Sequence, residues 1–153
     1  MILAAGLVSC SPAVIGRIAL SRNDQGALIA VAALCEGTLT DIEVIATDTN
    51  DDRESEPIEW TGDVSDTGIT EIRMTTPDWT GSVLSTYSVY GHGKEPWGLL
   101  GRPSANLLEP ISVDGTTLAL LRPGTVLGMG ADYADPTVQT YGEFWERSCP
   151  RDE

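Results

Sequence analysis

The only histidine and the only lysine of this chain lie two positions apart, and a tryptophan follows three residues later. They are His92, Lys94 and Trp97, and the segment 91–98 that contains them also holds three glycines. Imidazole exchanges protons near neutral pH, an ammonium group binds anions, and an exposed indole is a common interface anchor. Because loops on a rigid scaffold often carry function, we interpret this segment as a recognition loop. The alternative is a surface connection whose Trp97 packs into the core.

A second group with its own chemistry is the thiol of Cys10. The sequence Leu7-Val8-Ser9-Cys10 matches the bacterial lipobox, in which an apolar pair and a small residue precede a cysteine that is diacylated before the leading peptide is removed. Residues 1–6 are apolar, as the hydrophobic part of an export signal is. The nine residues before Cys10 contain no Lys or Arg and are shorter than a secretory signal, which indicates a start further upstream. The alternative is an accidental match, with Cys10 as an ordinary residue of a buried strand.

The other two cysteines form an even pair once Cys10 carries lipid. Cys35 ends the most apolar stretch of the chain, and Cys149 lies close to its C-terminus. A disulfide between them would hold a tail that otherwise frays, and the chain-entropy model gives it roughly 4–5 kcal/mol of stabilisation. Neither cysteine belongs to a CxxC motif, and a single histidine leaves a zinc site short of ligands. We therefore expect a disulfide.

An acidic run after residue 47 places oxygen-bearing side chains at spacings that resemble a calcium loop. These residues are Asp48, Asn50, Asp52, Glu56 and Glu59. Arg53 stands where the glycine of an EF-hand makes its sharp turn, and no helical pattern flanks the run. The alternative is a solvated hairpin loop that is kept open by the repulsion between its own charges.

The charge of the chain restricts its partners and its chemistry. A formal net charge of −14 repels phosphate backbones, so we expect no nucleic-acid partner. Nucleophilic catalysis lacks a recognisable motif, because the chain has no G-x-S-x-G and a single histidine. Its 23 acidic residues leave a hydrolase with paired carboxylates as the enzymatic alternative. We expect no cofactor other than the calcium considered above.

The elements that position these residues are predicted to be strands around one buried segment. Residues 27–37 form a long apolar run, which fits a strand buried on both faces or a short buried helix, and residues 16–20 fit its hairpin partner. Further strands are predicted at 41–48, 67–74, 84–91, 106–113 and 126–130. Asp114-Gly115 predicts a hairpin turn, although residues 116–121 also fit a short helix capped by Thr116. The aromatic residues Tyr141, Phe144 and Trp145 are expected to cap the core.

Several segments together resemble a group of bacterial proteins. They are the lipobox at Cys10, Gly16-Arg17-Ile18, the apolar strand that ends at Cys35, residues 87–91, residues 122–126 and the near-terminal Cys149. This set is similar to small uncharacterised exported lipoproteins of high-GC Gram-positive bacteria. The resemblance implies export and a β-sandwich, and it brings no activity or catalytic residues.

These observations predict a truncated signal segment over residues 1–10, followed by a single domain over residues 15–149. We expect an all-β fold, a two-sheet antiparallel sandwich of immunoglobulin or fibronectin type with about seven or eight strands and one short helix. The expected function is that of an extracytoplasmic lipoprotein, anchored to the cell membrane through lipid, that binds a protein or carbohydrate ligand. The alternative is an extracytoplasmic hydrolase with paired carboxylates, such as a carbohydrate-active enzyme.

Overall fold

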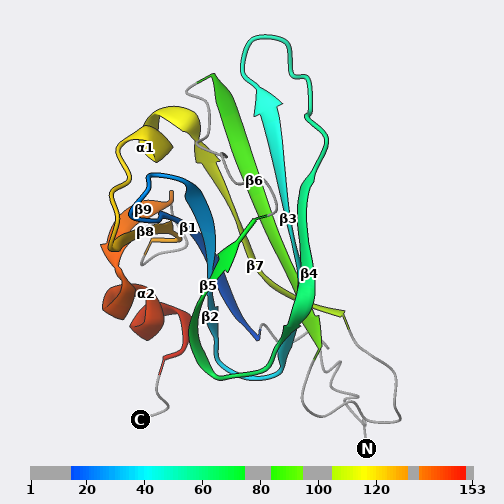
Figure 1. The fold of residues 1–153 in the computed structure, drawn as a ribbon, viewed down its shortest axis with the longest axis vertical. Helices are drawn as coiled ribbons and strands as arrows, with labels where there is room; N and C mark the ends of the chain where they lie inside the picture. The colour runs from blue at the N-terminus through cyan, green and yellow to red at the C-terminus, as the bar shows by residue number, and fades with distance from the viewer. Residues whose placement is uncertain (1–14, 75–83, 95–104, 131–134, 151–153) are drawn as a thin grey trace, which may run out of the picture.

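β-Strands make up most of the described chain, which comprises residues 15–74, 84–94, 105–130 and 135–150 of a computed structural model (Figure 1). The strands are β1 (Gly16–Arg22), β2 (Leu28–Leu34), β3 (Thr38–Asp48), β4 (Ile58–Val64), β5 (Gly68–Arg73), β6 (Ser85–Lys94), β7 (Ala105–Asp114), β8 (Thr125–Gly128) and β9 (Thr137–Thr140). The helices are α1 (Gly115–Ala119) and α2 (Tyr141–Ser148). The all-β class expected from the sequence is therefore confirmed.

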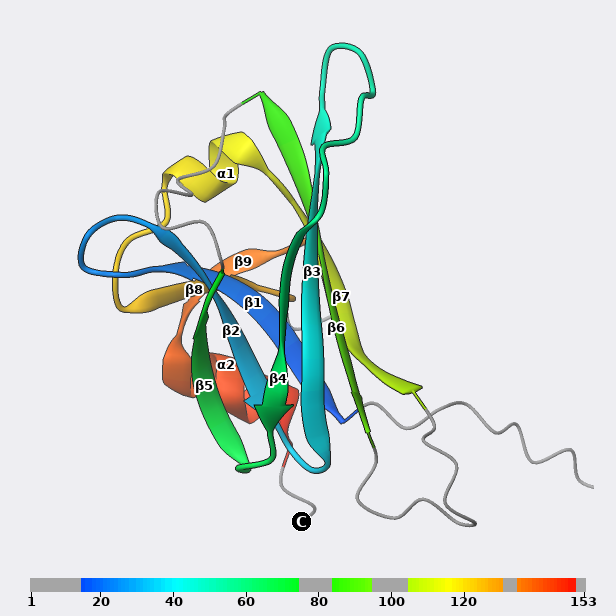
Figure 2. The same cartoon turned by 45° about the vertical axis from the view of Figure 1, so that its right-hand side comes forward.

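Strand pairing joins the nine described strands into one sheet of order β4-β3-β6-β7-β1-β2-β5, and β8 links β9 to β1. One group of strands within it comprises β4, β3, β6 and β7, and the other comprises β1, β2 and β5 together with β8 and β9. The two groups are connected at a narrow seam, where Arg17 of β1 pairs with Glu109 of β7 in parallel. The guanidinium Nε of Arg17 lies 2.9 Å from the Glu109 carboxylate. The two groups spread apart toward the end that carries α1 (Figure 2). Because this seam joins the groups, the two separate sheets of a sandwich are not confirmed.

Both groups of strands contribute to one apolar core. Ile18 of β1, Val44 of β3 and Val89 of β6 belong to the same buried cluster. At the spread end the cluster also includes Leu118 of α1 and Leu121 just after it, which are 1% and 3% exposed. α1 therefore closes the end of the core that the strands leave open.

The hairpin predicted from residues 16–20 and the apolar run at 27–37 is confirmed as β1 and β2. Every residue of β2 is buried, and β2 lies between β1 and β5. Leu28, Ala30, Ala32 and Leu34 belong to the main core, whereas Ile29, Val31 and Ala33 belong to a second cluster. Because successive side chains of a strand point to opposite faces, β2 needs apolar cover on both sides.

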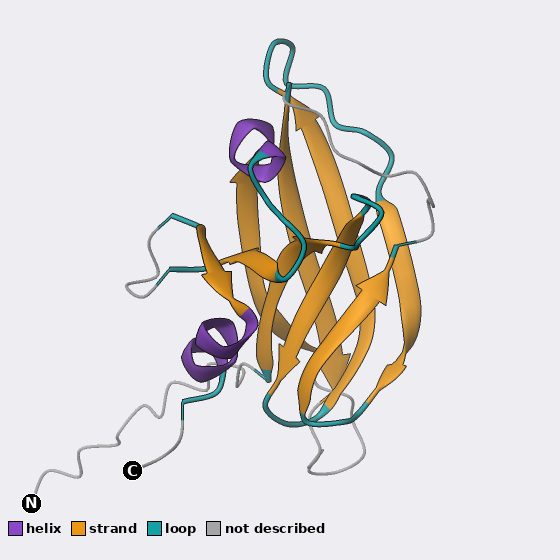
Figure 3. Ribbon diagram, turned by 60° about the vertical axis from the view of Figure 1, so that its left-hand side comes forward, coloured by secondary structure: helices purple, strands orange, loops and turns teal. Residues whose placement is uncertain are grey.

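α2 supplies the cover for the second cluster (Figure 3). Phe144 is 1% exposed there, and Tyr141 and Trp145 pack against the same cluster, so the predicted aromatic cap is confirmed. Thr140 and Glu143 form a capping box, and the hydrogen bond from Thr140 N–H lowers the pKa of the Glu143 carboxyl. At the other end Cys149 forms the expected disulfide with Cys35, with Cα atoms 5.4 Å apart. Both ends of α2 are thus fixed.

The Tyr141 hydroxyl connects α2 to two strands beneath it. It donates to the Glu71 carboxylate of β5 at 2.7 Å and lies 3.2 Å from the hydroxyl of Ser21. Ser21 is fully buried in β1 and donates to the carbonyl of Thr125 at 2.6 Å. Burial raises the pKa of Tyr141 above its ordinary value, and Glu71 adds to the rise while the Ser21 hydrogen bond opposes it.

This raised pKa predicts a loss of stability in alkali. The folded state holds the Tyr141 proton more tightly than the unfolded state, so the contribution is complete below the unfolded pKa of about 10 and disappears as the pH rises through the folded value. We expect Tyr141→Phe to flatten the decline of unfolding free energy between about pH 9 and pH 11. Urea unfolding across that range measures it, and parallel curves for the two proteins would contradict it. The other tyrosines and Lys94 are present in both proteins and cancel in the comparison.

Candidate functional site

The sole histidine forms a cross-strand pair with an aspartate that the sequence did not indicate. Asp41 of β3 lies opposite His92 of β6, and its Oδ1 is 2.5 Å from the imidazole Nδ1. The hydroxyl of Thr40 lies 2.9 Å from Oδ2 of Asp41 and 3.2 Å from the carbonyl of His92. The register shifts between Leu39 and Asp41, which is a β-bulge that turns these side chains toward solvent. The pair is about one-third exposed, with values of 35% for His92 and 38% for Asp41.

This geometry determines what the imidazole can do. Since Nδ1 of His92 faces a carboxylate, that carboxylate orients the ring and favours a hydrogen on Nδ1. Among the described residues, no side chain forms a hydrogen bond with Nε2 of His92. Lys94 lies two positions further along the strand, so its exposed side chain leaves the same face of β6. His92 and Lys94 therefore share one surface, and Trp97 lies outside the described residues.

The prediction of a recognition loop at 91–98 is wrong for its first part, because residues 91–94 belong to β6. The sequence pattern alone indicates that these glycines make a loop flexible. In the structure, Gly91 and Gly93 instead allow the backbone of β6 to pack closely against its neighbours. A Cβ on Gly93 would lie 2.4 Å from the carbonyl oxygen of Thr38 and 2.4 Å from a methyl group of Ile15. A Cβ on Gly91 would lie 3.0 Å from the side chain of Leu108. These glycines let β6 approach β3 and the core.

We therefore expect Gly93→Ala to lower the free energy of unfolding by about 1–3 kcal/mol, because the new methyl group has to displace the backbone of β3. Chemical denaturation measures the change. Gly142→Ala is the matched control, since Gly142 is exposed in α2 and the nearest atom to its Cβ position is 4.0 Å away. The control should leave stability unchanged or slightly higher, and equal effects at both positions would contradict the packing argument.

The residues of the predicted calcium loop do not converge in the structure. Asp48 ends β3, and one of its oxygens accepts a hydrogen bond from the backbone of Asn50 at 2.8 Å. Glu59 lies in β4 opposite Glu43, roughly 16 Å along β3 from Asp48 at the usual rise per residue. Strand pairing therefore separates the first and last residues of the motif. Among the described residues, no group of three or more His, Cys, Asp or Glu side chains is placed to hold a metal ion.

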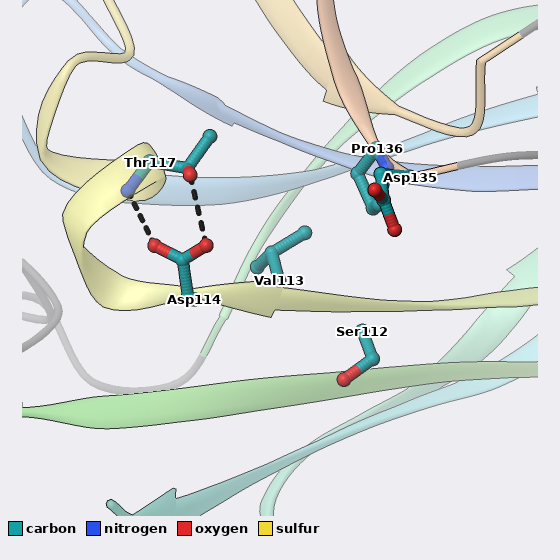
Figure 4. Close-up of a pocket in the computed structure, with 6 residues that line it drawn as sticks. All are labelled: Ser112, Val113, Asp114, Thr117, Asp135 and Pro136. Carbon is teal, nitrogen blue, oxygen red and sulfur yellow. Dashed lines mark hydrogen bonds between the residues drawn. The ribbon is translucent and has the colours of Figure 1, made fainter.

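Two carboxylates line a pocket of about 280 Å³ between the end of β7, α1 and the start of β9 (Figure 4). They belong to Asp114 and Asp135, and the lining also includes Ser112, Thr117 and Pro136. Figure 4 shows Asp114 turned toward Thr117, with Asp135 across the pocket beside Pro136. Two acidic residues thus share the lining of one polar pocket.

Asp114 already has a structural role in that pocket. It caps α1, since its oxygens accept hydrogen bonds from the backbone of Thr117 at 2.7 Å, from the Thr117 hydroxyl at 3.0 Å and from the Thr116 hydroxyl. The hydroxyl of Thr116 and the backbone of Thr117 lower the pKa of Asp114 to about 2. Its carboxylate is therefore ionised near neutral pH and does not donate a proton. The hairpin turn predicted at Asp114-Gly115 is wrong, and the short helix is confirmed with Asp114 as its cap in place of Thr116.

Comparison with protein-family models, curated sequences and solved structures finds no match. Neither helix in the described ranges has the length and apolar composition needed to cross a bilayer. Cys10 and Trp97 lie outside the described residues, so the description of the site includes neither of them. The described features that bear on function are the disulfide, the Asp41–His92 pair and the pocket.

Proposed function

We propose that this chain is an extracytoplasmic lipoprotein that is anchored to the cell membrane through lipid on Cys10 and acts as a binding module. The observation that carries the proposal is the disulfide between Cys35 and Cys149, because such bonds persist mainly in oxidising compartments outside the cytoplasm. Once these two cysteines are paired, Cys10 is the remaining cysteine of three. The lipobox pattern of Leu7-Val8-Ser9-Cys10 in the sequence supports the same conclusion.

The binding role is assigned to the surface that His92 and Lys94 share on β6. Asp41 holds the imidazole of His92 through Nδ1, which leaves Nε2 as the ring nitrogen for a ligand. Lys94 adds a positive charge on the same face of the strand. A protein or carbohydrate that offers hydroxyl or anionic groups fits this chemistry. The scaffold we propose is an immunoglobulin-like arrangement of two packed layers, which the single core between the two groups of strands supports.

Lipidation is tested by expressing the chain behind a complete export signal in a Gram-positive host. The wild type should partition into the detergent phase, and mass spectrometry should find a diacylated Cys10 at its N-terminus. Cys10→Ala should carry no diacylglycerol and should keep the residues before position 10, because the leading peptide is removed only after the cysteine is acylated. A wild type that stays in the aqueous phase and retains the residues before Cys10 would overturn the lipoprotein assignment.

The second candidate function is an extracytoplasmic hydrolase, which the pocket with Asp114 and Asp135 favours. Asp114 would supply the permanent carboxylate, and Asp135 would be the second carboxyl group across the pocket. Asn is also a good helix cap, so Asp114→Asn removes the charge and keeps α1 capped. If the chain releases reducing ends from cell-wall polysaccharide, that variant and Asp135→Asn should each abolish the release. Activity that survives both substitutions would exclude this pocket as the catalytic site.

A further inference from the structure

The position of Cys10 relative to the fold determines which end of the domain lies near the membrane. Cys10 precedes Ile15 by five residues, and a fully extended segment of that length spans at most about 18 Å. The carbonyl of Ile15 accepts a hydrogen bond from the backbone of Cys35 at 2.9 Å, so the chain enters the fold beside the connection between β2 and β3. A lipid on Cys10 therefore holds this end of the domain close to the headgroups.

The strand register identifies what else lies at this end. Thr38, the first residue of β3, pairs with Lys94, the last residue of β6. Leu34 at the end of β2 pairs with Gly68 at the start of β5, so the connection that contains Asp66 lies here too. We refer to this region, formed by residues 15, 35–37, 65–67 and 94, as the proximal end. It is the lower end of the strands in Figure 1.

The opposite end carries a long acidic connection between β3 and β4, which we refer to as the acidic finger (residues 48–56). It projects at the top of Figure 1. Its five carboxylates, those of Asp48, Asp51, Asp52, Glu54 and Glu56, are opposed by one guanidinium, that of Arg53. β3 has eleven residues, which places the finger roughly 35 Å from the proximal end.

We propose that the bilayer surface is the partner of the proximal end, and that the anchored domain stands with its acidic finger directed away from the membrane. This inference rests on the lipid anchor of the proposed function. The segment between Cys10 and Ile15, which tethers the domain to the lipid, is about half as long as the domain. The finger therefore reaches the headgroups only if the domain lies flat on the membrane. The five carboxylates of the finger face one guanidinium, whereas at the proximal end Glu36 and Asp66 face Lys94, so anionic headgroups repel the finger more strongly. This repulsion acts within a Debye length of about 8–10 Å and opposes that posture. His92 and Lys94 then face the space next to the membrane.

The test uses chemical coupling, so it does not depend on lipidation by a cell. Because the disulfide occupies Cys35 and Cys149, a chain that begins at Cys10 offers one free thiol to a maleimide lipid. An azide-bearing residue replaces either Asp66 at the proximal end or Asp51 in the finger, and a donor fluorophore is attached to it. Both positions are exposed aspartates in strand connections, so the two variants are matched. Vesicles of phosphatidylcholine and phosphatidylglycerol carry the maleimide lipid and an acceptor-labelled lipid.

We expect energy transfer to be strong from residue 66 and mostly lost from residue 51. A flexible Gly-Ser insert of about 20 residues between Cys10 and Ile15 should remove most of this difference, because it frees the domain to rotate. Equal transfer from the two positions with the native tether, or stronger transfer from residue 51, would overturn the proposed orientation. A Cys10 that stays unmodified in cells would instead refute the proposed function and leave the vesicle result unchanged.

Discussion

Replacing both Cys35 and Cys149 by serine is expected to lower the free energy of unfolding by roughly 4–5 kcal/mol in the chain-entropy model. The bridge joins residues 114 positions apart, so it removes a large share of the freedom of the unfolded chain. It also fixes the end of α2, which covers the second apolar cluster. Guanidinium unfolding of the oxidised wild type and the double variant measures the difference.

Two controls separate the bridge from the serine side chains. The wild type under reducing conditions should unfold at the same denaturant concentration as the double variant, because both lack the same crosslink. The single variant Cys35→Ser should match them, since one cysteine alone cannot form the bond. An oxidised wild type no more stable than these three would show that the disulfide contributes little to the fold.

The second large effect is expected at Phe144. This side chain is 1% exposed, and it fills the space between α2 and the outer face of β1 and β2. Phe144→Ala should lower the free energy of unfolding by about 3–5 kcal/mol, since the lost apolar contacts are accompanied by a cavity. Hydrogen exchange should also show faster exchange in β2 than in the wild type, because Ile29 and Val31 lose their cover.

Leu120→Ala is the matched control for this substitution. Leu120 follows α1 and is 74% exposed, so its truncation should change stability by no more than about 0.5 kcal/mol. Similar losses at Phe144 and Leu120 would mean that α2 is not packed on the sheet as described. A loss confined to Phe144 supports α2 as the cover of the second cluster.

The fold could be predicted from the sequence wherever local pattern and burial agree. The apolar run in β2 predicts a buried strand, because a strand that is covered on both faces has no polar positions. The strand predicted at 41–48 is part of β3, where Ile42 and Val44 are buried. The disulfide followed from the parity of Cys35 and Cys149 and their places at the ends of elements.

Other features could not be predicted, because they depend on pairing between distant segments. Asp41 carries no local signal of its contact with His92, which arises from the register of β3 and β6 and from the bulge at Thr40. The glycines of β6 suggest a loop in the sequence, because the close contacts that require them come from segments distant in the chain. One missed element did leave a signal: Thr140 and Glu143 have the spacing of a capping box, which marks the start of α2.

The narrow seam between Arg17 and Glu109 has a consequence for the order in which the chain acquires its structure. β1 precedes its neighbours β7 and β8 by several other strands, so these neighbours are made long after it. Contacts of such long range form slowly, because the intervening chain must be ordered first. A nascent chain that ends before β7 can build the hairpin of β1 and β2 but cannot complete the core. The topology therefore delays closure of the core until β7 and β8 have been made.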